Sequence, residues 1–146
     1  MSTWLLLLTL AAAGPAQADA PGWQHRRNLL QEPLPHVDQR QSIDGALYKV
    51  SYSADTFDGK PPLGRMHQWT VTVEPKQATG GQLRLAASGD MPQHLHGLPT
   101  NIEITRQKDG HFLITGVKFH MVGWWRLTLT VSDGERSEDF VFQLIL

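Results

Sequence analysis

Apolar side chains recur at every second position along most of this chain, and this alternation restricts the fold more than any other sequence feature. It is clearest where Trp69, Val71 and Val73 alternate with Thr70 and Thr72. A period of two places one set of side chains on one face of a β-strand. Similar apolar series lie in 47–52, 83–87, 102–104, 112–114, 117–131 and 140–144. The chain therefore predicts about seven strands.

Turn-forming residues separate these apolar series. Asp109-Gly110 and Asp133-Gly134 each stand between two apolar runs, where the type I′ turns of hairpins need residues that tolerate positive φ. Gly80-Gly81 forms a third break, and no long segment shows a helical period. We expect an all-β fold, an antiparallel immunoglobulin-like or cupredoxin-like β-sandwich of about seven strands. A small closed barrel is the alternative.

The N-terminus predicts export. An apolar run over 4–13 is followed by Gly14-Pro15 and ends at Ala18 in the A-x-A pattern of a secretory signal peptide. The run is shorter than the roughly 18 apolar residues that span a membrane. We expect residues 1–18 to be a cleaved signal peptide and the protein to be periplasmic or secreted, without a stable membrane span. Residues 19–42 lack periodicity and predict a flexible arm, which leaves the domain in 43–146.

Composition excludes several classes of function. The chain has no cysteine, so it forms no disulfide and holds no blue-copper site, which requires a thiolate. Its 13 basic and 14 acidic residues are scattered, without the basic stripe that nucleic-acid binding needs. We expect no nucleic-acid partner. The sequence also lacks the G-x-S-x-G and H-E-x-x-H motifs of hydrolases, and we expect no enzyme.

Methionine and histidine occur close together. Of the four methionines, each of the three beyond Met1 lies within three positions of a histidine. The pairs are Met66 with His67, Met91 with His94, and Met121 with His120. Thioether and imidazole together suit Cu(I), a soft ion. This pattern predicts a copper site.

The segment from Met91 to Thr100 is the densest of these motifs. Two prolines and a glycine predict a rigid loop, and the H-x-H spacing of His94 and His96 directs both imidazoles to one side. The other interpretation of this loop is a polar surface whose histidines are only solvated.

Met121 continues the apolar series of Val117 and Phe119, so it is either a ligand or a core side chain. Alternation places His120 on the opposite face, and the pattern therefore favours Met121 over His120. The predicted metal ligands are Met91, His94, His96 and Met121.

Three motifs resemble those of the YtkA-like domains, a group of small exported β-sandwich proteins related to FixH. They are Gly64-Arg65-Met66-His67 before the strand at Trp69, the segment from Met91 to Thr100, and the segment from Gly116 to Trp125. The resemblance covers roughly 44–146. It implies an accessory protein, and the related FixH proteins are linked to cytochrome oxidase assembly and copper supply.

The sequence is compatible with two functions. The first is an exported metal-binding accessory protein, a periplasmic Cu(I) carrier or chaperone that serves a copper-receiving protein such as an oxidase component. The second is a metal-free β-sandwich adaptor that binds a partner protein through the loop rich in histidine and proline. An exposed, rigid loop serves either function.

Overall fold

The computed structural model describes residues 34–146. By its internal contacts the chain divides into two units, Met1–Gln31 and Glu32–Leu146, and the described residues lie in the second. The predicted signal peptide, residues 1–18, lies outside the described residues, as does the predicted arm up to residue 33. In the part that is described, no helix is long and apolar enough to cross a membrane.

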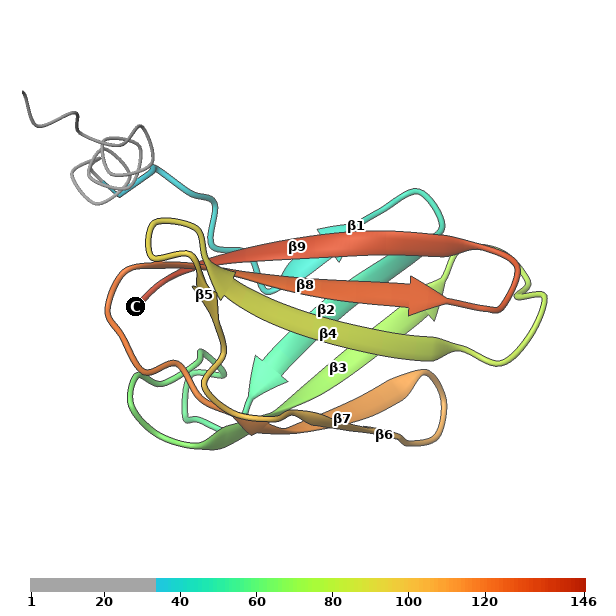
Figure 1. Ribbon diagram of the computed structural model, residues 1–146. Helices are drawn as coiled ribbons and strands as arrows, with labels where there is room; N and C mark the ends of the chain where they lie inside the picture. The colour runs from blue at the N-terminus through green and yellow to red at the C-terminus, as the bar shows by residue number, and fades with distance from the viewer. Residues whose placement is uncertain (1–33) are drawn as a thin grey trace, which may run out of the picture. The chain divides into compact units, whose positions relative to one another are not determined.

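Two antiparallel sheets form a β-sandwich, which confirms the predicted fold class (Figure 1). The first sheet contains, in spatial order, β1 (Ser42–Asp44), β2 (Tyr48–Ala54), β3 (His67–Pro75), β7 (His111–Val117) and β6 (Glu103–Arg106). The second contains β5 (His96–Gly97), β4 (Arg84–Met91), β8 (Trp124–Ser132) and β9 (Ser137–Ile145). All neighbouring strands within the sheets pair antiparallel.

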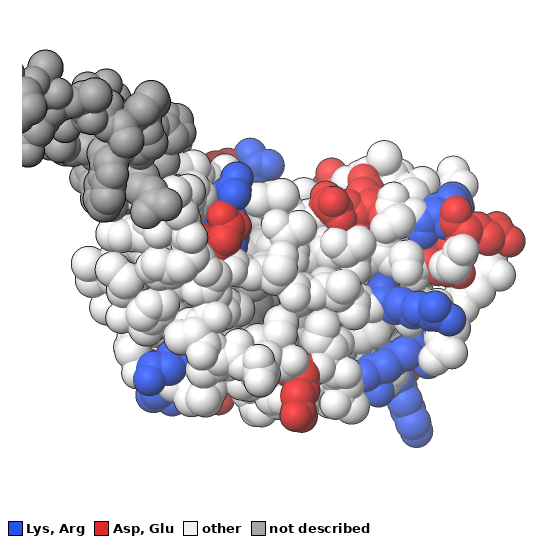
Figure 2. Space-filling view, in the orientation of Figure 1, with Lys and Arg blue, Asp and Glu red and all other residues white. Residues whose placement is uncertain are grey.

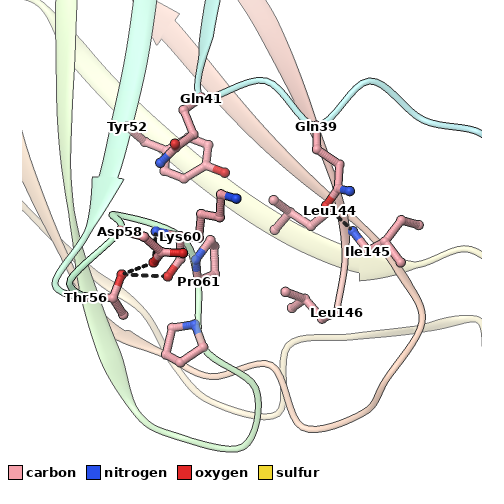
Figure 3. A pocket seen from close by; sticks show the side chains of 11 residues that line it. Gln39, Gln41, Tyr52, Thr56, Asp58, Lys60, Pro61, Leu144, Ile145 and Leu146 are labelled. Atoms are coloured by element: carbon pink, nitrogen blue, oxygen red, sulfur yellow. Dashed lines mark hydrogen bonds between the residues drawn. The ribbon is translucent and has the colours of Figure 1, made fainter.

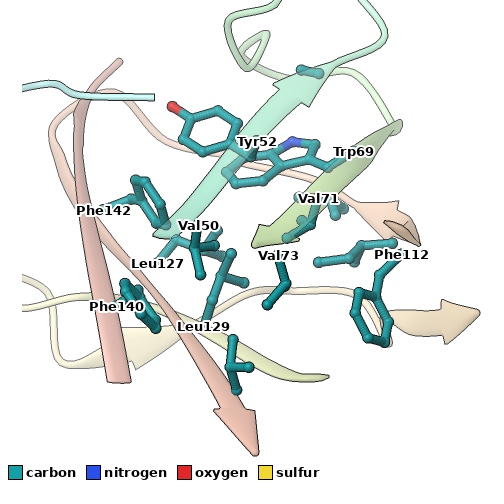
Figure 4. Packing of buried hydrophobic residues seen from close by; sticks show 14 of the residues in the cluster. Val50, Tyr52, Trp69, Val71, Val73, Phe112, Leu127, Leu129, Phe140 and Phe142 are labelled. Atoms are coloured by element: carbon teal, nitrogen blue, oxygen red, sulfur yellow. The ribbon is translucent and has the colours of Figure 1, made fainter. Parts of the chain in front are cut away.

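The core lies between the inward faces of the two sheets (Figure 4). In β3 the buried side chains of Trp69, Val71 and Val73 alternate with exposed or half-buried threonines. In β8 the residues Trp125 and Leu127 begin the same alternation on the facing sheet. Burying each such side chain stabilises the fold by about 1.5–3 kcal/mol. Apolar burial of this kind takes the place of disulfides in a chain without cysteine.

The described part contains nine strands, two more than the alternation predicts. The additional ones are β1 and β5, with three and two residues, which are too short to show a period in the sequence. The apolar series over 117–131 is also not one strand, because β7 ends at Val117 and β8 begins at Trp124. The segment between them is a loop.

One of the two predicted Asp-Gly turns has the expected geometry. Asp109 and Gly110 have φ values of 55° and 75°, and the His111 amide donates to the Lys108 carbonyl across them. Two positive φ values at the central positions are what a type I′ turn requires.

The prediction for Asp133 was wrong. Its amide donates to the Arg136 carbonyl, so Asp133 precedes the turn and Gly134, with φ of 93°, is the first central residue. This is the pattern of a type II′ turn.

The end of the predicted arm is bonded to both sheets. The Gln41 carbonyl accepts from the Tyr52 amide at 3.0 Å, and the Gln39 side-chain oxygen accepts from the Ile145 amide at 2.9 Å. Strand β1 then begins at Ser42.

Candidate functional site

Three loops meet at one end of the sandwich (Figure 1). They are residues 55–66 between β2 and β3, residues 92–95 between β4 and β5, and residues 118–123 between β7 and β8. The Gly64 amide donates to the Phe119 carbonyl at 2.7 Å, and Gly123 exchanges two backbone hydrogen bonds with Leu146, at 2.7 and 3.0 Å. The loop 118–123 is therefore fixed from both sides.

The predicted His/Pro loop forms a tight hairpin. The amides of His94 and Leu95 both donate to the Met91 carbonyl, at 3.1 and 2.9 Å, and Met91 then pairs with His96 across β4 and β5. Leu95 lies in the left-handed region with φ of 57°, a conformation that costs a non-glycine residue roughly 1–2 kcal/mol. This bend sets His94 and His96 on either side of Leu95.

Three imidazoles lie close together, and two of them contact the indole of Trp125. The ring centroids of His94 and His96 are 5.8 Å apart, and those of His96 and His120 are 5.1 Å apart. His96 and His120 also contact Trp125, with centroid separations of 6.2 and 5.6 Å. His94 and His96 are half-buried, whereas His120 is exposed. The structure thus brings together the two predicted histidines and adds His120.

Sequence reasoning set His120 aside because it applied the alternation of a strand to residues 117–121, which lie beyond β7 except for Val117. In a loop, the alternation of faces does not apply. Gly123 has φ of 131°, and the Met121 carbonyl accepts a hydrogen bond from the Trp125 indole at 2.9 Å. Gly123, which interrupts the apolar series, was the signal that this segment leaves the sheet.

The two predicted methionine ligands are packed into or against the core, unlike the histidines. Met91 is fully buried in the core, and a Cβ atom at Gly123 would lie 3.0 Å from its methyl group, so the side chain sits beneath the loop 118–123. Met121 is half-buried and packs against the core. The described ring contacts join the three histidines, while both methionines pack as core side chains.

The spacing of the rings permits a shared ion. A metal about 2.0–2.1 Å from an imidazole nitrogen lies roughly 3.2 Å from the ring centroid, so two rings that share it have centroids within about 6.4 Å. Both histidine pairs meet this limit. Among residues 34–146, however, no three His, Asp or Glu side chains converge closely enough to hold a metal by themselves. A third ligand would have to be of another type.

One contact of His96 favours metal binding. Its Nδ1 lies 3.4 Å from the carbonyl oxygen of Gly97. When Nδ1 carries the proton and donates to this carbonyl, Nε2 keeps its lone pair. Histidine ligands of metals are commonly oriented in this way by a backbone carbonyl.

His67 is buried beneath the same end of the sandwich. Its Nδ1 lies 3.1 Å from the Arg65 carbonyl, and its ring is 5.7 Å from that of Phe119. Burial lowers the pKa of His67, and the hydrogen bond to Arg65 opposes this only in part. The ring is therefore neutral in the fold at neutral pH.

Figure 2 shows that few charged side chains lie at the end with the three loops, whereas both signs gather at the opposite end. Leu95 and Val122 are exposed beside the histidines.

Comparison with known proteins gives the fold but no family. No protein-family model and no curated protein matches the chain. Its structure is similar to that of a DUF4426 family protein from Pseudomonas aeruginosa PAO1, with a TM-score of 0.51 and 12% sequence identity. The match covers 73% of this chain and 96% of that chain. At this identity, the likeness shows a shared fold alone.

Proposed function

We propose that this protein is an exported metal-binding accessory protein, a periplasmic Cu(I) carrier or chaperone. The observation that supports it is that the ring of His96 lies between those of His94 and His120, with centroids 5.8 and 5.1 Å away. The histidines come from the β4–β5 hairpin and from the loop 118–123, which are far apart in sequence. A bound ion would therefore link the β4–β5 hairpin to the loop that enters β8.

The available donors suit Cu(I) better than a hard ion. Imidazole and thioether are ligands of soft and borderline metals, whereas Ca²⁺ and Mg²⁺ prefer clustered carboxylates. Met91 is paired directly opposite His96, and cross-strand partners place their Cβ atoms about 4.5–5.5 Å apart. We therefore keep Met91 in the ligand set, together with His96 and one of the two histidines beside it. Met121, one residue beyond His120, is the other thioether that the test must examine.

The exposure of the site suits transfer to a partner. His120 is exposed, and Leu95 and Val122 offer an apolar surface next to it. A copper-receiving protein, such as an oxidase component, could cover this surface while its own ligands approach His120. Likeness to the YtkA-like domains and export through residues 1–18 belong to the same proposal.

A Cu(I) competition titration tests the ligand set. The mature chain from residue 19 is titrated under reducing conditions against a chromophoric Cu(I) chelator. We expect the double variant His96→Ala/His120→Ala to bind Cu(I) at least about tenfold more weakly than the parent, or ~1.4 kcal/mol. His111→Ala is the matched control, because His111 lies on β7 and contacts Thr72 instead. Equal affinity in the double variant and the control would exclude the histidine site.

Two further variants examine the sulfur ligands. Met91→Leu and Met121→Leu keep the volume of a core side chain at a usual cost below about 1.5 kcal/mol. We expect Met91→Leu to weaken Cu(I) binding and to leave the circular dichroism spectrum unchanged. A variant that binds Cu(I) like the parent assigns its methionine to packing alone.

The metal-free adaptor remains the second candidate, and one observation favours it. In the described part of the chain, no group of three His, Asp or Glu side chains converges on a common point. The same apolar surface at Leu95 and Val122 would then bind a partner protein directly. Failure of the parent protein to compete for Cu(I) would favour this function.

A further inference from the structure

A cavity of about 420 Å³ lies between the β2–β3 loop and the end of β9 (Figure 3). Gln39 and Gln41, just before β1, form part of its wall, and Leu144 and Leu146 form the side facing Lys60 and Pro61. The volume falls in the range of about 300–1,000 Å³ that small-molecule sites occupy. None of the three histidines lines it, so it is a second feature, independent of the proposed copper site.

Part of the cavity wall is apolar and held in place by its neighbours. The ring of Tyr52 is stacked on Trp69, with centroids 4.1 Å apart and planes 16° from parallel. Pro61 and Leu144 are buried, and the backbone of Leu146 is held by its two bonds to Gly123. An apolar group that entered the cavity would meet walls that are already in place, which reduces the cost of ordering them.

Several polar groups on the wall have unused hydrogen-bonding capacity. The oxygen of the Gln39 amide accepts from Ile145, which leaves its NH₂ group available. The Tyr52 hydroxyl and the Lys60 ammonium group form no hydrogen bond or ion pair with any residue of 34–146. Figure 3 shows the Lys60 side chain reaching over the cavity below Tyr52.

The one side-chain carboxylate on this wall is already engaged. Asp58 accepts from the Lys60 backbone amide at 3.1 Å and from the Thr56 hydroxyl at 3.3 Å. The hydrogen bond from the Lys60 backbone is the main cause that lowers the pKa of Asp58. Burial raises the pKa of Tyr52 to about 12, so its hydroxyl stays protonated and can donate. The free groups are therefore mainly donors, and one of them is a cation.

We propose that this cavity binds a small organic monocarboxylate with an aromatic or branched aliphatic body. The body packs between Pro61 and Leu144, over the ring of Tyr52. The carboxylate is received by the Lys60 ammonium group and the Tyr52 hydroxyl, with the Gln39 amide as a further donor. Charge-assisted hydrogen bonds of this type are about twice as strong as neutral ones.

An NMR titration of the copper-free, ¹⁵N-labelled mature protein tests this proposal. The probes are 3-phenylpropanoate and its uncharged isostere 3-phenylpropanamide. We expect the carboxylate to shift the backbone amide signals of Lys60 and Ile145 and to bind at least about tenfold more tightly than the amide. Equal affinity for the two probes would overturn the proposed recognition of charge. Shifts confined to other parts of the domain, or no shifts at all, would overturn the site.

Matched variants separate charge recognition from general effects. Lys60→Met removes the ammonium group and keeps the aliphatic stem, and Tyr52→Phe removes only the hydroxyl. Lys60→Met should weaken binding of the carboxylate and leave the affinity for the amide nearly unchanged. Tyr52→Phe should weaken binding of the carboxylate more than binding of the amide. Lys108→Met, which removes an exposed charge in the β6–β7 turn, should bind both probes like the parent. If Lys60→Met and Lys108→Met behave alike, Lys60 does not receive the carboxylate.

Discussion

The side chain of Asp133 forms hydrogen bonds both within its own turn and to a distant segment. Its side chain is fully buried and accepts from the amides of Glu135 and Arg136, at 3.1 and 2.9 Å, and from the Arg136 guanidinium at 2.9 Å. The Gly80 amide adds a longer contact of 3.4 Å. The Asp133 carboxylate therefore links the β8–β9 turn to the segment between β3 and β4, which connects the two sheets.

The charge of Asp133 should make stability depend on acid. The backbone and side-chain hydrogen bonds from Arg136 hold the pKa of Asp133 far below its ordinary value of 3.8. A depressed pKa stabilises the fold above the ordinary value, and this contribution is lost as pH falls toward the folded-state pKa. The parent should therefore exceed Asp133→Asn in stability by a constant amount above about pH 5, and by less below about pH 4.

Urea denaturation at pH 7, 5 and 3 measures this difference, with Asp38→Asn as the control for loss of an exposed carboxylate. A gap between parent and Asp133→Asn that stays the same at all three pH values would show that the charge is not responsible.

At the scale of elements, the sequence predicted the strands that have one buried face. In β2, β3, β8 and β9, burial alternates strictly enough to appear as a period of two. The short strands β1 and β5 were missed because their pairing depends on neighbouring backbone and not on side-chain pattern.

The candidate site was also predicted only where a local sequence pattern indicates it. The H-x-H spacing indicated that His94 and His96 lie close together, and the structure places their rings 5.8 Å apart. His120 joins them only because residues 118–123 leave the sheet. That path depends on contacts with Leu63 and Leu146, which are distant in sequence and invisible to a local pattern.

Two glycines with nearly the same φ allow a matched test of the β6–β7 hairpin. Gly110 and Gly64 have φ of 75° and 74°, so alanine at either position incurs the left-handed cost of about 1–2 kcal/mol. A Cβ at Gly110 would also collide with the Val73 carbonyl oxygen, whereas at Gly64 nothing lies within 4 Å.

We expect Gly110→Ala to lower the free energy of unfolding by about 1–3 kcal/mol more than Gly64→Ala, because β3 must shift to relieve the overlap. Chemical denaturation of the two variants measures the difference. Equal losses of unfolding free energy in the two variants would mean that the close contact between Gly110 and Val73 does not contribute to stability.

On the scale of the whole molecule, the two ends of the sandwich differ in chemistry. One end carries the turn built around Asp133 and most of the charge in Figure 2, and the other carries the three loops and the imidazoles. The apolar core between them needs no cysteine, and the distant structural neighbour shares this fold alone. Function therefore has to be sought in the loops, where the scaffold holds His96 and His120 against Trp125.

The copper content of the untagged protein, isolated from the exported fraction of cells grown with added copper, tests the central claim most directly. We predict that the parent protein carries copper in stoichiometric amount and that His96→Ala/His120→Ala, folded as judged by circular dichroism, carries almost none. Zinc should be low in both, because a thioether contributes little to a harder ion. A parent protein without copper, or a double variant with as much copper as the parent, would contradict the proposed function.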